Sequence, residues 1–177
     1  VVMEVSSHSI AQNRIAGIPF DATMFTNLTQ DHLDYHENMR SYGEIKSKLF
    51  TEIESKIKII NCIDDFGKKL SKEIQEDVIE ITNISVPREF KGLFLNIEKS
   101  LANGLGYSVS IQSSWGHKEF NLPLIGAFNV ENASQVIALL LSYNFNFNKI
   151  VSAIKILTPP KGRMQLVRLT SNKRLPK

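Results

Sequence analysis

Three short polar clusters hold the residues whose types and spacing could support chemistry. The first is residues 4–8 (Glu-Val-Ser-Ser-His) followed by Gln12 and Arg14, the second is residues 26–36, and the third is residues 129–132. Each cluster follows an apolar run typical of a strand or begins an apolar helix. The ends of strands form the usual ligand-binding edge of an open α/β sheet. The clusters therefore predict ligand binding along such an edge.

Glu4 and His32 are the two side chains in these clusters best suited to a divalent cation. One offers a hard carboxylate oxygen and the other an imidazole nitrogen. Each also has an ordinary interpretation, because a Glu after an apolar strand usually forms a salt bridge and a single loop His usually lies on the surface. Spacing alone favours the ordinary interpretation over a metal site.

Lys46 occupies an unusual place on a predicted helix at about residues 38–53. It lies four residues from both Tyr42 and Phe50, at the edge of an apolar stripe with helical spacing. Lys48 lies on the polar face, with a glutamate four residues away on either side. A lysine at an apolar edge usually extends its ammonium group to solvent. The functional alternative is unusual chemistry of the amine.

The elements that would position these residues alternate in type through the first half of the chain. The second predicted helix begins with Asp64 or Asp65 as its cap and ends near residue 74. Strands are predicted at residues 1–5, 22–26, 57–63 and 78–81. This alternation predicts an α/β fold with a mostly parallel sheet flanked by helices.

The second half of the chain has a different pattern. Between residues 84 and 124 the strands are shorter and alternate in polarity, which predicts a small, peripheral antiparallel portion. A helix at residues 132–143 is apolar nearly all round and is expected to be buried. Another follows at residues 148–157, with Asn148 as a plausible N-cap. Residues 158–162 indicate a hinge, and a strand at residues 164–169 is expected to open another domain.

Composition excludes several classes of protein. The 21 basic and 18 acidic residues among 177 give a net charge of +3 without a dense basic block, so nucleic-acid binding is not expected. No apolar stretch could cross a membrane, and no signal peptide is visible, so a soluble, reducing compartment is the expectation. The single cysteine, Cys62, is predicted to be buried and inert. The chain does not begin with Met, and we expect it to be truncated at both ends.

Four ordered motifs resemble the Mur ligase family, and the first two resemble its MurE type. They span most of the chain, with residues 56–120 the weakest stretch. The motifs are residues 3–8 (MEVSSH), residues 25–36 (FTNLTQDHLDYH) with Tyr42 and Lys46 after them, residues 124–133 (LIGAFNVENA) and residues 162–164 (GRM).

The resemblance implies an ATP-dependent ligase that acts on UDP-N-acetylmuramoyl-L-alanyl-D-glutamate. ATP would phosphorylate the glutamate γ-carboxylate, and the amine of a diamino acid, meso-diaminopimelate or L-lysine, would attack the acyl phosphate to form an amide. The charge on the phosphoryl group calls for cations and hydrogen-bond donors around it. The enzyme is expected in the bacterial cytoplasm, as a monomer.

Site residues carried over by position fall into three groups. Glu4, His32 and Lys46 would hold Mg2+ and serve catalysis, with Lys46 carbamylated into an anionic oxygen ligand. Ser6, Gln12 and Arg14 would bind the muramoyl peptide. The residues that would contact ATP are Asn27, Asn132 and Arg163.

Residues 1–161 are expected to be the central ATP-binding domain and residues 162–177 the hinge and start of a C-terminal domain. The family's Gly-rich phosphate loop is implied to lie upstream, because no Gly-Lys-Ser/Thr occurs here. This segment alone is therefore expected to be inactive. The alternatives are another Mur ligase, a ligase similar to folylpolyglutamate synthetase, or a non-catalytic α/β binding domain.

Overall fold

A six-stranded sheet forms the centre of the structure, a computed structural model that describes residues 1–29, 38–74, 78–84, 90–160, 162 and 164. The strands lie side by side in chain order, and each pairs with the next, with a shift of register between Ile97 and Lys99 in the β4–β5 pair. They are β1 (Phe20–Phe25), β2 (Ser55–Asn61), β3 (Val78–Thr82), β4 (Leu93–Ala102), β5 (Tyr107–Ser113) and β6 (Gly116–Leu122).

The sheet changes direction at β4. Strands β1 to β4 are parallel, and β4, β5 and β6 pair antiparallel. Helix α3 (Met39–Thr51) connects β1 to β2 and α4 (Asp65–Ile74) connects β2 to β3, because a parallel pair needs a crossover connection, whereas β5 and β6 are joined by a tight turn. The prediction of a mostly parallel α/β sheet with an antiparallel portion is confirmed.

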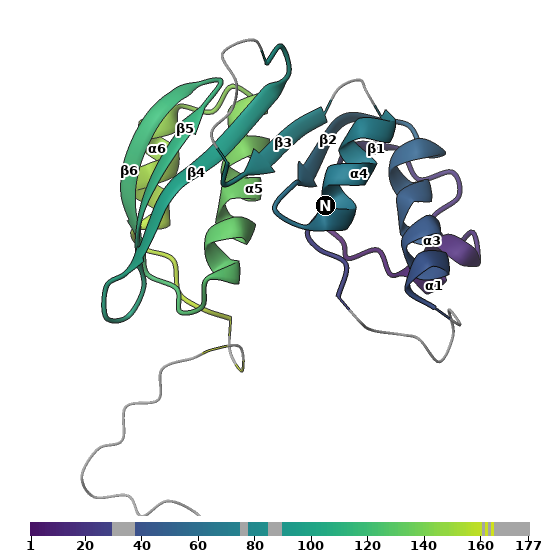
Figure 1. Ribbon diagram of the computed structural model, residues 1–177, viewed down its shortest axis with the longest axis horizontal. Coiled ribbons are helices and arrows are strands. Elements are labelled where there is room, and N and C mark those ends of the chain that lie inside the picture. The colour runs from purple at the N-terminus through teal and green to yellow at the C-terminus, as the bar shows by residue number, and fades with distance from the viewer. Residues whose placement is uncertain (30–37, 75–77, 85–89, 161, 163, 165–177) are drawn as a thin grey trace, which may run out of the picture.

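Helices cover both faces of the sheet (Figure 1). The short helix α1 packs on α3, and α3 and α4 cover one face of the parallel strands. On the other face α5 crosses β2, β3 and β4, and α6 packs on α5 and β6. The helices are α1 (Ser7–Ala11), α3 (Met39–Thr51), α4 (Asp65–Ile74), α5 (Phe128–Ser142) and α6 (Phe147–Ile154).

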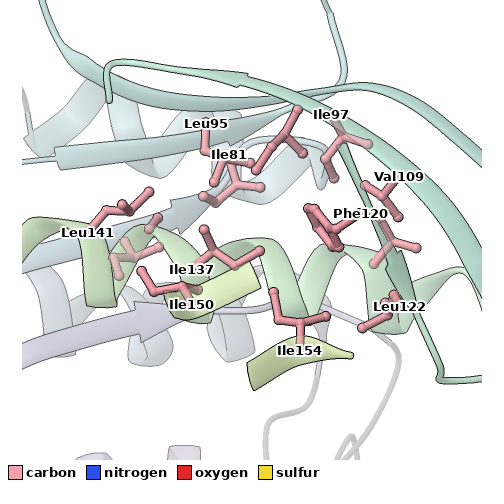
Figure 2. Close-up of a cluster of buried hydrophobic side chains, with 14 of the residues drawn as sticks. Ile81, Leu95, Ile97, Val109, Phe120, Leu122, Ile137, Leu141, Ile150 and Ile154 are labelled. Atoms are coloured by element: carbon pink, nitrogen blue, oxygen red, sulfur yellow. The ribbon is translucent and has the colours of Figure 1, made fainter. Parts of the chain in front are cut away.

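The alternation of side chains along each strand divides the core into two clusters. On β2, Ile59 belongs to the cluster under α5 and α6, while Ile60 belongs to the cluster under α3 and α4. Figure 2 shows the first cluster, in which Ile137 of α5 and Ile150 of α6 lie against side chains of the sheet such as Ile81. The sheet thus holds its parallel strands between two apolar layers, and its strand ends are left for polar residues.

Two predictions about the ends of elements were wrong. Residues 1–5 form no strand, and Val1 and Val2 are exposed. A β-branched run forms a strand only where a neighbouring strand is available to pair and pack with it. Among the described residues β1 pairs only with β2, so residues 1–5 have no strand partner. Helix α6 begins with Asn146 as its N-cap rather than Asn148, because the Asn146 side chain accepts from the Lys149 backbone N–H at 3.2 Å.

Two other predictions were corrected in part. Helix α5 begins at Phe128, before residue 132, and it is not buried all round, since Phe128 and Val136 are exposed. The antiparallel strands do lie at one edge of the sheet, but they continue it directly from β3, and β4 to β6 supply much of the larger core cluster. The strand predicted at residues 164–169 lies outside the described residues apart from Met164.

In the part of the chain that the structure describes, no helix combines the length and apolar character needed to cross a membrane.

Candidate functional site

The carboxyl ends of β1 and β2 bring two of the three polar clusters together. Thr26 directly follows β1, and Asn61 is the last residue of β2. Helix α5 begins at the same edge, because Glu131 in its first turn reaches Asn61. The second and third clusters, which are about a hundred residues apart in sequence, therefore meet at the edge of the sheet where ligands bind in such folds.

Asn61 makes the contact between these clusters. Its side chain is 1% exposed, and its Nδ2 donates to the Thr26 carbonyl and to Glu131 Oε2, both at 2.8 Å. Its Oδ1 accepts from the Ile63 backbone N–H at 3.1 Å. A buried amide is costly unless it is hydrogen-bonded, and here both of its ends have partners.

Asp64 holds the loop after β1 from a second direction. Its Oδ1 accepts from the backbone N–H groups of Phe66 and Gly67 at 2.8 and 3.0 Å, which caps α4 and confirms that part of the sequence prediction. Its Oδ2 accepts from the Leu28 backbone N–H at 3.1 Å. One carboxylate therefore fixes both a helix start and the loop that begins the second cluster.

Gly67 permits the close approach of α4 to β2 at this edge. A Cβ atom at position 67 would lie 2.0 Å from the Asn61 carbonyl oxygen, a separation that real Cβ atoms essentially never show. The first turn of α4 can therefore lie directly against the end of β2 only with glycine at this position.

Lys46 lies where the helical pattern predicted. It is half-buried on α3, with its Nζ 5.0 Å from the centre of the Tyr42 ring, while Leu49 and Phe50 pack into the core. Lys48 is exposed and forms an ion pair with Glu52 at 3.3 Å. The two lysines, two residues apart, thus occupy the different environments that the sequence indicated.

The proposed metal ligands are only partly described. Glu4 is exposed and Lys46 is half-buried, and neither has an ion-pair partner among the described residues. His32 lies outside the described residues. In the described part of the chain, no three His, Cys, Asp or Glu residues gather in a way that could hold a metal ion. The metal assignment therefore stays a prediction.

The proposed substrate-binding residues surround α1. Ser6 is its N-cap and accepts from the Ser9 backbone N–H at 3.2 Å, and Gln12 is its C-cap. Arg14 follows after Asn13, which adopts a positive φ of 54°. The side chains of Gln12 and Arg14 are exposed, and α1 packs on α3, the helix that carries Lys46.

The proposed ATP contacts lie on both sides of Asn61. Asn27 follows Thr26, and Asn132 follows Glu131, and both asparagines are exposed. Asn129, one turn earlier on α5, donates to the Ile125 carbonyl at 2.8 Å and fixes the approach to the helix. Arg163 lies outside the described residues.

Cys62 is buried, as predicted. It belongs to the core cluster under α4, whereas the Asn61 side chain contacts α5 on the other face of the sheet. Burial is the main reason that the pKa of its thiol rises to about 12, and the nearby Glu80 carboxylate adds to the effect. A thiol with such a pKa is protonated at physiological pH and is a poor nucleophile.

Sequence reasoning missed the roles of Asn61 and Glu131. A single asparagine near the end of an isoleucine-rich run was a visible signal, because a buried strand normally carries apolar residues. Its partners, however, are 35 and 70 residues away. Periodicity cannot identify contacts of that kind.

A cavity of about 580 Å³ lies away from this site. It is lined by residues that begin β2, β3 and β4, such as Lys56, Val78 and Leu93, and by Ser142 at the end of α5. It therefore opens at the amino ends of the parallel strands. We assign it no part in the site at their carboxyl ends.

Comparison with known proteins places the chain in a family. The family description "Mur ligase middle domain" matches residues 1–140. A curated relative from Wigglesworthia glossinidia brevipalpis, "UDP-N-acetylmuramoyl-L-alanyl-D-glutamate--2,6-diaminopimelate ligase", is 39% identical over 94% of the chain and 34% of its own length. A relative of the same name from Haemophilus influenzae (strain PittGG) is 37% identical over 93% of the chain and 34% of its length.

Solved structures agree with this assignment. A structure titled as a ligase of the same name has a TM-score of 0.79 and 26% identity, and the match covers 94% of this chain and 34% of that one. The chain spans about a third of the length of the curated relatives that it matches. With a family match over residues 1–140 and the six-stranded sheet in common, the chain belongs to the Mur ligase family and corresponds to its middle domain.

Proposed function

We propose that this chain is the central, ATP-binding part of a ligase that adds a diamino acid to UDP-N-acetylmuramoyl-L-alanyl-D-glutamate in the bacterial cytoplasm. The observation that carries the proposal is the 39% identity over 94% of the chain to a relative named for this reaction. The proposal includes the division of the chain into a central domain, residues 1–161, and a hinge with the start of a C-terminal domain, residues 162–177.

The proposed reaction has two steps. An oxygen of the glutamate γ-carboxylate attacks the γ-phosphorus of ATP, which releases ADP and leaves an acyl phosphate. The amine of the diamino acid then attacks the acyl carbon and forms an amide, and inorganic phosphate leaves. Both steps concentrate negative charge, so the protein must supply hydrogen-bond donors and cations at the reacting groups.

The proposed ATP contacts have support from the geometry of the strand ends. Asn27 and Asn132 are exposed, and each directly follows a residue that Asn61 holds. The loop and the helix start that carry them are therefore fixed to one strand end, which favours a nucleotide bound between them. Arg163 completes the proposed set.

The proposed metal site uses Glu4, His32 and a carbamylated Lys46. The two that are described suit the purpose chemically, because Glu4 is exposed and offers a carboxylate, and Lys46 is half-buried on α3 with its Nζ 5.0 Å from the centre of the Tyr42 ring. Mg2+ bound there would offset the charge on the phosphoryl group. Lys46 would contribute an oxygen ligand in place of its positive charge.

The proposed binding of the muramoyl peptide falls to Ser6, Gln12 and Arg14. Arg14 is exposed at the end of α1 and can present its guanidinium to a carboxylate or phosphate of the substrate. Because α1 packs on α3, the substrate would be held beside the helix of Lys46. For the added amino acid, the names of the relatives favour 2,6-diaminopimelate over L-lysine.

The test is an activity assay on the full-length protein. Phosphate release should require ATP, the UDP-muramoyl dipeptide and 2,6-diaminopimelate together, and the product should carry one added diamino acid by mass spectrometry. L-lysine should replace diaminopimelate poorly. Activity with a different muramoyl peptide or with a folate in place of the dipeptide would assign the chain to another ligase. ATP binding without any ligation would favour a non-catalytic domain.

A further inference from the structure

Asn61 connects three segments of the chain with one side chain. Its Nδ2 binds the Thr26 carbonyl, 35 residues before it, and Glu131 Oε2, 70 residues after it. Its Oδ1 binds the Ile63 backbone N–H of its own loop. Asn61 is the last residue of β2, directly after the buried Ile59 and Ile60, and its side chain is almost fully buried.

Packing alone does not account for an asparagine at this position. The neighbouring buried residues of β2, Ile59 and Ile60, are apolar, and an apolar residue of similar size would avoid the desolvation of an amide. A fully hydrogen-bonded buried amide instead specifies the relative position of the groups that it joins. At Asn61 those groups are the loop after β1 and the first turn of α5.

Both of these segments carry a proposed ATP contact in the next residue. Asn27 follows Thr26, and Asn132 follows Glu131. We propose that Asn61 is a positioning residue for the nucleotide: it holds the two ATP-contact segments at a fixed separation through Thr26 and Glu131, without touching ATP itself. This inference rests on the proposed function, which supplies the two contacts.

The structure also separates positioning from folding. The loop after β1 has a second attachment, because Asp64 accepts from the Leu28 backbone N–H at 3.1 Å. Helix α5 has its own apolar contacts with β2, β3 and β4. Loss of the Asn61 contacts should therefore shift Asn27 and Asn132 relative to each other while both segments stay folded.

The test variant is Asn61→Asp in the full-length enzyme. It removes the donor to Thr26 and places a carboxylate against the Glu131 carboxylate, so the two segments should move apart. The KM for ATP should rise by roughly tenfold or more. Loss of one buried hydrogen bond is enough for a change of this size when it displaces the groups that contact ATP. The KM for the UDP-muramoyl dipeptide, which binds beside α1, should change much less.

A second variant tests the mechanism of the effect. Adding Glu131→Gln to Asn61→Asp provides an amide at position 131 that can donate to the new carboxylate, while the contact with Thr26 remains lost. The KM for ATP should recover in part. The matched control is Asn121→Asp on β6, where the exposed side chain accepts from Asn103 and Ser108 and keeps its acceptor oxygen.

The outcomes distinguish this inference from the proposed function. If the wild-type protein binds ATP by calorimetry but does not ligate, the proposed ligase fails, and the same variants are then compared by their Kd for ATP. An unchanged KM or Kd for ATP in Asn61→Asp would overturn the positioning role. The positioning role would also be overturned if the KM values for both substrates rose equally, the Tm fell and the double variant showed no recovery. That result would mean that Asn61 is merely structural. A wild-type protein that binds no ATP overturns both proposals.

Discussion

Two regions of the molecule carry polar side chains that are hydrogen-bonded to other side chains or to the backbone. At the carboxyl ends of β1 and β2 these hydrogen bonds join distant segments, and on the outer face of β4, β5 and β6 they join adjacent strands. At the strand ends, Asn61 and Asp64 are buried or partly buried and join segments 35 to 70 residues apart. On the antiparallel strands, Ser110 contacts Glu98 and His117, which come from the neighbouring strands and are exposed.

This difference separates two uses of polar residues. An exposed network exchanges its hydrogen bonds with water at little cost, so it contributes solubility and little else. A buried one is costly to break, so its presence at a strand end indicates that the position of the joined segments matters. The parallel strand ends are therefore where we place function, and the outer antiparallel face is the internal control.

The largest expected effect concerns Lys46 on the parallel side. Lys46→Ala should lower kcat by about a hundredfold or more. Loss of a residue that only supports a metal ligand costs up to about a hundredfold, and Lys46 is proposed as a ligand itself. The helix should be retained, because Ala is a good helix former. Acetate, which can occupy the vacated space as a carboxylate, should restore part of the rate. The measurement is kcat with and without short-chain acids, alongside a melting curve.

Lys48→Ala is the matched control for this prediction. Lys48 is exposed and pairs only with Glu52 among the described residues, so the variant should behave like the wild-type enzyme. If Lys46→Ala keeps near-normal kcat, or if both variants are equally impaired, Lys46 is an ordinary lysine whose ammonium extends to solvent.

The next prediction concerns Cys62. It follows Asn61 in sequence, and its side chain lies in the core cluster under α3 and α4. Because burial raises the pKa of its thiol to about 12, the native protein at pH 8 should react with a disulfide reagent at least about a hundred times more slowly than the unfolded chain. The same pKa predicts the sign of a stability effect. The unfolded thiol ionises near pH 9 and the folded one near 12, so stability should fall as the pH rises through this interval.

The control for Cys62 is Cys62→Ala, which should lack this part of the alkaline loss of stability. Fast labelling of the native wild-type protein at pH 8 would mean that the strand end opens readily. It would then contradict the contrast between a firmly held parallel edge and an exchangeable outer face.

Asp64→Ala tests how much the contacts at the carboxyl ends of β1 and β2 contribute to the stability of the protein. The change removes the N-cap of α4 and leaves the Leu28 backbone N–H without its partner, so the free energy of unfolding should fall by about 2 kcal/mol. Asp65→Ala, one residue later, should cost far less, because Asp65 is exposed and pairs only with Lys68 among the described residues. Urea unfolding followed by the fluorescence of Trp115, the single tryptophan, gives both values.

The sequence predicted the fold where local pattern and tertiary structure agree. The stripe through Tyr42 and Phe50 identified α3 and the environment of Lys46, because helical spacing alone decides which residues face the core. A cap at Asp64 or Asp65 was predicted from the preference for aspartate at helix starts, and the structure shows that Asp64 is the cap. The alternation of strands and helices was sufficient to predict the parallel sheet.

The same reasoning failed where tertiary contacts decide. Residues 1–5 have the composition of a strand, yet among the described residues no neighbour pairs with them. Asn61 lay in a correctly predicted strand, but its contacts with Thr26 and Glu131 arise only when three segments meet. The exposed residues of the candidate site stay predictions from the sequence, and the buried side chain that joins their segments could not be predicted from it.

The smallest effect is expected on the outer antiparallel face. Ser110→Ala removes hydrogen bonds of 3.1 Å to Glu98 and 3.0 Å to His117. Ser110 is half-buried, and Glu98 and His117 are exposed and lie 3.4 Å apart. Water can replace each lost contact, so the free energy of unfolding should change by less than about 0.5 kcal/mol. Ligase kinetics should not change, because this face is remote from the ends of β1 and β2. Urea unfolding and KM measurements on the same preparation check both statements. A loss of 1 kcal/mol or more, comparable to that of Asp64→Ala, would show that the exposed network is held as firmly as the buried one, and burial would no longer explain the contrast between the two regions.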